Sequence, residues 1–245
     1  MTTFAIAIPT EYGQMIVNRN DINQAGALIR TGRAFHHEEI NLLRKVLANS
    51  GTNLVVLDVG ANFGTHTFGL VPVVGEGGAI HAFEPQRIIF NMLAGSVALN
   101  GLTNVHCHNV AIGAKEGQTE IPQFDYSQPM NFGSIEFGAE QRESVHQRRG
   151  RDSESVEFVP LRTIDSFSFR HADLIKLDVE GMEEDALLGA KDTITRCRPF
   201  LFIEFLKSDK RALASKIVAF DYQLHEFGDN FLAVPTELAP GVEFA

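Results

Sequence analysis

The sequence predicts an α/β fold with a mostly parallel sheet and helices on both faces. Apolar stretches of strand length alternate with stretches of helical periodicity, as in successive β-α-β units. The stretch 53–57 is rich in Val and Leu, which is typical of a strand buried on both faces. It leads into a turn that contains Gly60 and Gly64 and then into a helix, an order that suits a ligand at the carboxyl end of a central strand.

Length and composition indicate one compact domain. The chain has 245 residues, of which 44% are hydrophobic, enough for the core of a single α/β domain. We expect one domain over 1–245, with an N-terminal cap at 1–34, where periodicity is weak, and a Rossmann-like core at 35–245. A polar excursion at 125–154 interrupts that core.

The first half of the core is predicted to run helix 36–48, strand 53–57, helix 65–71, strand 79–83, helix 86–99 and strand 105–112. Pro72 cannot donate a helical hydrogen bond, so we expect the helix after the glycine turn to end or kink there. In helix 86–99, Ile88, Met92 and Leu99 are expected to face inward.

The second half is predicted to contain a hairpin of 116–124 with 155–161, strand 173–177, helix 182–194 and strand 200–205. Ser208 is a suitable N-cap for a helix through 219. The stretches 222–227 and 230–234 flank Gly228 and Asp229, which indicates a second hairpin and a last, antiparallel strand.

The glycine turn carries the first functional signal. A dinucleotide site prefers a glycine where this chain has Asn62, and Asp58 would repel a phosphate but could accept hydrogen bonds from an ammonium group, such as the amino-acid end of S-adenosylmethionine. Glu84 ends the next strand at the spacing of an acid that binds ribose hydroxyls. An ordinary tight turn is the competing interpretation, and Glu84 favours the ligand.

Five segments of the chain resemble successive blocks of the FkbM-type S-adenosylmethionine-dependent methyltransferases. In the family's order, they are 57–64 (LDVGANFG), 82–85 (AFEP), 100–105 (NGLTNV), 161–165 (LRTID) and 175–183 (IKLDVEGME). They cover roughly residues 35 to 205, most of one domain. The blocks around Glu84 and Asp178 are more specific than the glycine turn.

The resemblance implies a Rossmann-like class I methyltransferase fold with seven strands in the order 3-2-1-4-5-7-6. It also implies S-adenosyl-L-methionine as cofactor and methylation of a hydroxyl oxygen on a sugar or secondary metabolite. The residues that we assign to the cofactor are Asp58, Gly60, Asn62, Phe63, Gly64, Glu84, Pro85, Asn109, Val110 and Asp178.

Candidate catalytic residues are Asp178, Glu180 and His66, because an alcohol needs a base or a hydrogen-bond acceptor beside it. Asp178 ends an apolar strand at the expected ligand edge of the sheet. The alternative is that Asp178 only caps the following helix, and for the acids of 183–185 we prefer such a role at a helix N-terminus. His66 could equally be a packed, neutral histidine.

The excursion at 125–154 contains Asn131, Phe132, Gly133 and Ser134, similar to a short polar segment of the family, and then Arg142, Arg148, Arg149 and Arg151. A solvated loop is the simpler interpretation. If the excursion is a lid, its arginines could bind an anionic small-molecule acceptor, for example a sugar acid.

Several partners are disfavoured. The net charge of −10 opposes nucleic-acid binding. No segment has the length and apolarity of a membrane span, and Cys107 and Cys197 suggest reduced thiols. We therefore expect a cytoplasmic protein. His36 and His37 are adjacent on a helix and cannot share one ion, hence no metal site is predicted. The sequence leaves open whether the chain forms a homo-oligomer. It also leaves open two other functions: an NAD-dependent oxidoreductase, which explains Glu84 but not Asn62, and a non-catalytic binding protein.

Overall fold

The computed structural model of the protein describes residues 3–135 and 156–239. Arg142, Arg148, Arg149 and Arg151, with much of the predicted excursion at 125–154, therefore lie outside the described residues. Within the described part of the chain, no helix is long and apolar enough to cross a bilayer.

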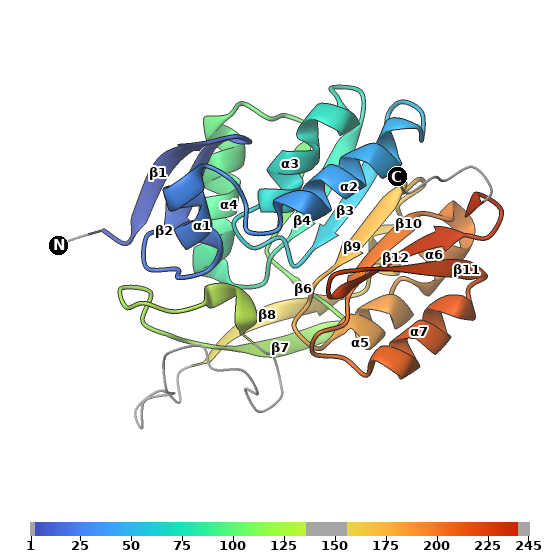
Figure 1. Cartoon of the computed structure of the whole chain (residues 1–245). Coiled ribbons are helices and arrows are strands. Elements are labelled where there is room, and N and C mark those ends of the chain that lie inside the picture. Colours follow the sequence, from blue (N-terminus) through green and yellow to red (C-terminus); the bar gives the residue numbers. More distant parts are fainter. Residues whose placement is uncertain (1–2, 136–155, 240–245) are drawn as a thin grey trace.

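A central sheet of seven strands organises the molecule (Figure 1). Its members are β3 (Val55–Val59), β4 (Ala79–Phe83), β5 (Val105–His108), β9 (Leu174–Leu177), β10 (Phe200–Glu204), β11 (Tyr222–Phe227) and β12 (Asn230–Pro235). They lie in the order β5-β4-β3-β9-β10-β12-β11, which reads 3-2-1-4-5-7-6 when these strands are numbered along the chain. β12 runs antiparallel to both of its neighbours, so the expected hairpin at Gly228 and Asp229 is confirmed.

Helices cover both faces of this sheet. α2 (His37–Ala48), α3 (Thr65–Val74) and α4 (Arg87–Leu99) share a core with strand residues such as Val56 and Phe202. α5 (Glu183–Leu188), α6 (Lys191–Cys197) and α7 (Lys210–Val218) pack on the alternate strand residues, such as Leu57 and Ile203. The strands β3, β9, β10 and β12 thus bury both of their sides, which explains the continuous apolar runs of the sequence.

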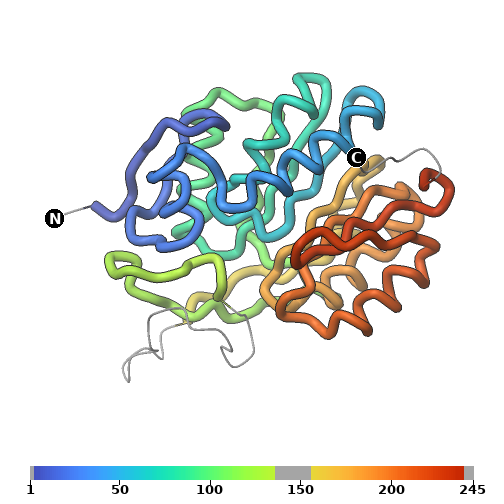
Figure 2. The backbone as a smooth tube through the Cα atoms, in the orientation of Figure 1, coloured from blue at the N-terminus to red at the C-terminus, as the bar shows by residue number. Residues whose placement is uncertain are grey.

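The first thirty-odd residues form a β-hairpin and a short helix, β1 (Ala5–Thr10), β2 (Gly13–Asn18) and α1 (Gln24–Thr31). The hairpin is fastened to α4: the amide of Ile16 donates to Oγ of Ser96 at 2.8 Å, and the amide of Gln14 donates to Oδ1 of Asn100 at 2.9 Å. In Figure 2 the hairpin, in deep blue, lies on the opposite side of the molecule from the orange and red strands β10 to β12.

A second, three-stranded sheet of β6 (Ala111–Ile112), β7 (Gly117–Pro122) and β8 (Val156–Arg162) lies below the first in Figure 1. β7 and β8 pair antiparallel, which confirms the predicted hairpin partners. The single strand expected at 105–112 is wrong. Asn109 donates side-chain hydrogen bonds to the carbonyls of Glu84 and Pro85, and after this turn β6 joins β8 instead.

One alternative for α3 and one expectation about α4 are also wrong. α3 does not end at Pro72 but continues to Val74, because the amide of Gly75 still bonds to the carbonyl of Val71 at 3.0 Å and the helix is buried against α2. In α4, Leu99 is exposed, whereas Ile89 and Leu93 face the core.

The predicted helix 182–194 is two helices, α5 and α6, broken at Gly189. A Cβ there would come within 2.1 Å of the carbonyl oxygen of Gly113, and Asp165 from the short helix η2 (Asp165–Phe167) binds the first amides of α6. The N-cap of α7 is Asp209, whose carboxylate accepts from the amides of Arg211 and Ala212, and not Ser208.

Candidate active site

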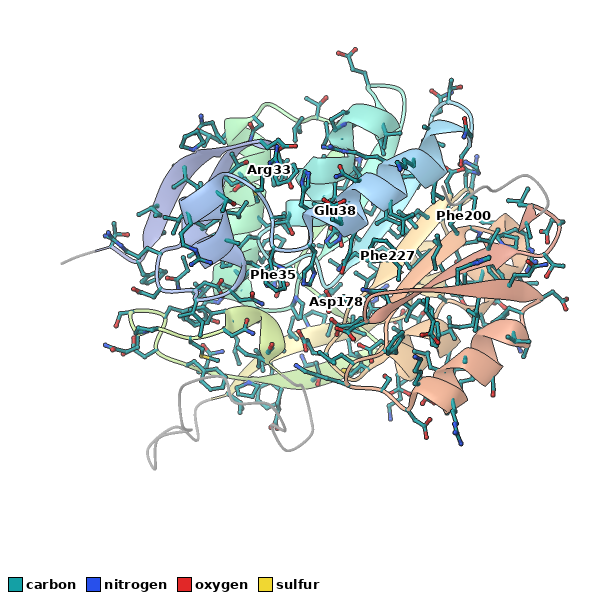
Figure 3. The ribbon with its side chains drawn as sticks, in the orientation of Figure 1. Arg33, Phe35, Glu38, Asp178, Phe200 and Phe227 are labelled. Atoms are coloured by element: carbon teal, nitrogen blue, oxygen red, sulfur yellow. The ribbon has the colours of Figure 1, made fainter. Side chains whose placement is uncertain are left out.

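A cavity of about 270 Å³ opens at the carboxyl ends of β3, β4, β9 and β10. In Figure 3, Asp178 lies near the middle of the molecule at this edge, with Phe35 to one side of it. The predicted site residues that line the cavity are Gly60, Asn62, His66, Glu84, Pro85, Val110, Asp178 and Glu180. The sheet therefore brings residues from distant blocks to one place, as expected for open α/β folds.

Four residues assigned to the cofactor do not line the cavity. Asp58 and Phe63 are buried behind it, with exposed fractions of 1% and 0%. Gly64 faces the core, where an added Cβ would meet side chains of Leu93 and Phe68 within 3 Å. Asn109 holds the main chain of Glu84 and Pro85. These four lie behind the residues that line the cavity, and their direct contact with a cofactor stays a prediction.

The glycine turn has a backbone that few residue types tolerate. Gly60 has φ +81°, and a Cβ on it would stand 1.7 Å from the carbonyl oxygen of Asp178. The ends of β3 and β9 thus approach each other too closely for any side chain. Asn62 adopts φ +50°, a left-handed conformation that Asn accepts more readily than most residues.

Asn62 and Glu84 together form the part of the cavity that can bind a polar ligand. Oε2 of Glu84 accepts from the amide of Asn62 at 2.9 Å and Oε1 accepts from the amide of Gln86 at 2.8 Å. Burial raises the pKa of Glu84 to about 7. Oδ1 of Asn62 is buried and has no hydrogen-bond partner among the described residues. A buried acceptor left unmatched is unfavourable, so this atom favours a ligand that donates to it.

Lys176 is a buried cation that the sequence interpretation missed. Its Nζ lies 3.5 Å from Oδ1 of Asp58, 3.3 Å from Oδ2 of Asp178 and 3.4 Å from the carbonyl oxygen of Gly60, with its side chain 4% exposed. Oδ2 of Asp58 accepts from Oγ1 of Thr67 at 2.6 Å. Asp58 is therefore paired inside the protein. A lysine within an otherwise apolar strand was the available signal.

The three acids at the ends of β9 and β10 differ in protonation. Burial disfavours ionisation of Asp178, but the Lys176 ammonium together with His36 and His66 outweighs it and holds the pKa of Asp178 below its ordinary value. Burial, and then the negative charge of Asp178, raise the pKa of Glu180 to about 8, and the same causes raise that of Glu204 to about 10. Glu180 contacts Nζ of Lys207 and has φ +57°, a strained value for a non-glycine residue.

The helix-capping alternative for Asp178 is wrong. α5 begins at Glu183 with Met182 as N-cap, and no side chain caps it. Glu183 has the structural role instead. Its Oε1 accepts from the amides of Val179 and Gly181, both at 3.1 Å, and Ser208 donates to its Oε2. Glu183 thereby fixes the loop that carries Glu180.

Two residues that were not assigned to the site, Glu39 and His36, join the predicted His66 beside the same cavity. Glu39 on α2 places Oε2 at 3.3 Å from Nε2 of His66 and at 3.5 Å from Nδ1 of His36. All three side chains line the cavity. His36 and Glu39 are three residues apart at the start of α2, but His66 comes from α3, so spacing along the sequence could not join it to them.

Among residues 3–135 and 156–239, no group of three or more His, Cys, Asp or Glu side chains is arranged to hold a metal ion. The absence of a metal requirement stays a prediction. The two cysteines in this part of the chain, Cys107 and Cys197, are free thiols.

A family model described as Methyltransferase FkbM domain matches residues 58–231. Among solved structures, the chain is similar to Methyltransferase FkbM from Methylobacillus flagellatus KT, at 21% identity and a TM-score of 0.51, over 74% of this chain and 43% of that one. The chain thus spans less than half the length of that protein. The likeness confirms the predicted class I methyltransferase fold.

Weaker likenesses join this chain to methyltransferases with different acceptors. One is a SAM-dependent O-methyltransferase from Thermotoga maritima, at 11% identity and a TM-score of 0.41, over 94% of this chain and 71% of that one. Another is the Pyrococcus abyssi tRNA (uracil-54, C5)-methyltransferase in complex with S-adenosyl-L-homocysteine, at 13% identity and a TM-score of 0.45, over 95% and 44%. Neither indicates an acceptor for this protein. No curated protein matches the chain.

Proposed function

Because the chain belongs to the methyltransferase FkbM family, we propose that it is an S-adenosylmethionine-dependent enzyme that methylates a hydroxyl oxygen of a small molecule. The family supports the methyltransferase activity and the type of cofactor. Oxygen as the methylated atom and a sugar or secondary metabolite as the acceptor are the finer proposal. The observation that carries it is that Asn62, Glu84 and Asp178 line one cavity.

The residues of the glycine turn fit such a cofactor. Asn62 offers an unmatched acceptor, and each oxygen of Glu84 can accept a further hydrogen bond beside the one it already has. We assign the amino-acid end of the cofactor to Gly60 and Asn62, and its ribose to Glu84. Asp58 supports this arrangement through Lys176 and does not bind the ammonium itself. When bound, the cofactor supplies a methyl group on a cationic sulfur.

We assign Asp178, at the end of β9, and Glu180, in the loop after it, to the part of the cavity that binds the acceptor. A carboxylate with a lowered pKa is a weak base but remains a good hydrogen-bond acceptor, so Asp178 orients the hydroxyl in this proposal. Glu180 is occupied by Lys207 in the structure, and His66 faces Glu39. The suggestion of an anionic acceptor rested on arginines outside the described residues and receives no support from the cavity.

Calorimetric titration tests the cofactor assignment. We expect S-adenosylmethionine to bind the protein and NAD not to bind, which separates a methyltransferase from an oxidoreductase and from a protein that binds neither. Glu84→Ala should weaken binding of S-adenosylmethionine by about tenfold or more, because hydrogen bonds to a charged group are worth about 1.5–3 kcal/mol each.

The matched control is Glu226→Ala, which removes an exposed acid on β11 and should leave the affinity unchanged. Since Glu84 also holds the amide of Asn62, the melting temperature of each variant is measured in parallel. Unchanged affinity in a folded Glu84→Ala variant would contradict the placement of the ribose.

A further inference from the structure

Glu39 joins two histidines in one wall of the cavity. Its Oε1 accepts from Nδ2 of Asn230 on β12 at 3.1 Å, which fixes the carboxyl group at one end. Its Oε2 then lies between Nε2 of His66, at 3.3 Å, and Nδ1 of His36, at 3.5 Å. The two imidazole rings stand edge to face with centroids 6.4 Å apart. One carboxylate thus lies beside both rings.

This orientation decides which nitrogen of His36 is basic. A carboxylate that faces Nδ1 favours the tautomer with hydrogen on Nδ1, which leaves the lone pair on Nε2. The same carboxylate stabilises the imidazolium that forms when Nε2 takes a proton. For His66 it is Nε2 that faces Glu39, at 3.3 Å, and this buried nitrogen makes no hydrogen bond to the described residues.

We propose that Nε2 of His36, held by Glu39, accepts the proton of the acceptor hydroxyl in the methyl transfer. The inference rests on the proposed function and deepens it. In this step the hydroxyl proton moves to Nε2, the oxygen forms the bond to the methyl carbon, and the electron pair of the broken carbon–sulfur bond stays on sulfur. The imidazolium afterwards returns its proton to water.

Three observations favour His36 over the other groups of the cavity. Its side chain is 23% exposed and can exchange a proton with solvent, whereas that of His66 is 5% exposed. Asp178 is held ionised by Lys176, and Glu180 is engaged by Lys207. Burial lowers the pKa of His36, so the ring is neutral and ready to accept at physiological pH. The charged and titratable groups that face it are Glu39 from α2, His66 from α3, and Asp178 and Lys176 from β9.

The inference is tested by NMR titration of the histidine rings, which needs no acceptor. The pKa of His36 is measured in the free protein, with saturating S-adenosylmethionine and with saturating S-adenosylhomocysteine. The two ligands differ at the reacting sulfur, which is cationic only in the first. If His36 lies beside the reacting centre, its pKa should be lower with S-adenosylmethionine by about one pH unit or more, the usual effect of a close like charge. His171, which is exposed and lies apart from the cavity, serves as the internal control and should not differ.

The role of Glu39 is tested in the same experiment. Glu39→Gln should lower the pKa of His36 by about one pH unit, because the carboxylate no longer stabilises the imidazolium. Glu38→Gln, one residue earlier on α2 and exposed, should leave it unchanged. Equal His36 pKa values with the two bound ligands, or no effect of Glu39→Gln, would overturn the inference alone. Failure of both ligands to bind would overturn the proposed function and the inference with it.

Discussion

The two walls of the cavity are built in different ways. The turn wall, made of residues 60–62 and 84–86, comes from two short segments, and its contacts are mainly bonds to main-chain amides, such as those that Glu84 accepts. The acid–histidine wall, made of His36, Glu39, His66, Asp178, Glu180 and Glu204, comes from several elements and depends on charges. The turn wall therefore suits a ligand that is the same in every reaction, as the proposed cofactor is. The side chains of the acid–histidine wall can instead be adapted to a particular acceptor.

Gly60→Ala should have the largest effect, because it tests how rigid the turn wall is. Gly32→Ala is a matched control: both glycines have positive φ, +81° and +71°, but nothing lies within 4 Å of a Cβ at Gly32. The control should lose about 1–2 kcal/mol of unfolding free energy from its backbone conformation. Gly60→Ala adds a collision with the carbonyl of Asp178 and should exceed about 4–5 kcal/mol, by urea unfolding. Equal losses would mean that β3 and β9 move apart easily.

Lys176→Met should have the next largest effect, because Lys176 joins the two walls through Gly60 and Asp178. Removing it leaves the buried carboxylate of Asp58 and the partly buried one of Asp178 without a cation, and the loss of one partner from a buried pair usually lowers the unfolding free energy by about 3–5 kcal/mol. Lys216→Met is the control, since its partner Glu184 is on the surface and such pairs contribute about 0–1 kcal/mol. If both variants unfold at the same urea concentration, Lys176 does not hold the walls together.

The turn wall could be predicted from the sequence, whereas most of the second wall could not. Gly60, Asn62 and Glu84 lie within two motifs whose order along the chain fixes their position on a parallel sheet. Glu39 meets His66 only because α2 packs beside α3, and no spacing rule contains that contact. Asp58 illustrates another contact that the sequence does not contain. The motif places Asp58 correctly at the end of β3, but its ion pair with the internal Lys176 depends on the direction of one buried side chain.

The smallest expected effect concerns the charge of the acid–histidine wall and follows from Glu204. Burial, and then the charge of Asp178, raise its pKa to about 10 in the folded protein, above the ordinary value of 4.5. Above pH 4.5 the unfolded chain therefore releases a proton that the folded protein keeps. The contribution of Glu204 to the unfolding free energy is therefore fully present below pH 4.5 and is lost as the pH rises towards 10.

Glu204→Gln removes that titration, so its melting temperature should change less steeply with pH than that of the unaltered protein. Relative to the unaltered protein, we expect the melting temperature of the variant to rise steadily between pH 5 and pH 9. The rise should be about 2–4 °C for each kcal/mol of difference in unfolding free energy in a domain of this size. Glu226→Gln, at an exposed acid, should keep the original pH dependence. A difference between Glu204→Gln and the unaltered protein that stays constant over this range would show that Glu204 ionises freely. The acid–histidine wall would then carry more negative charge at neutral pH than these pKa values indicate.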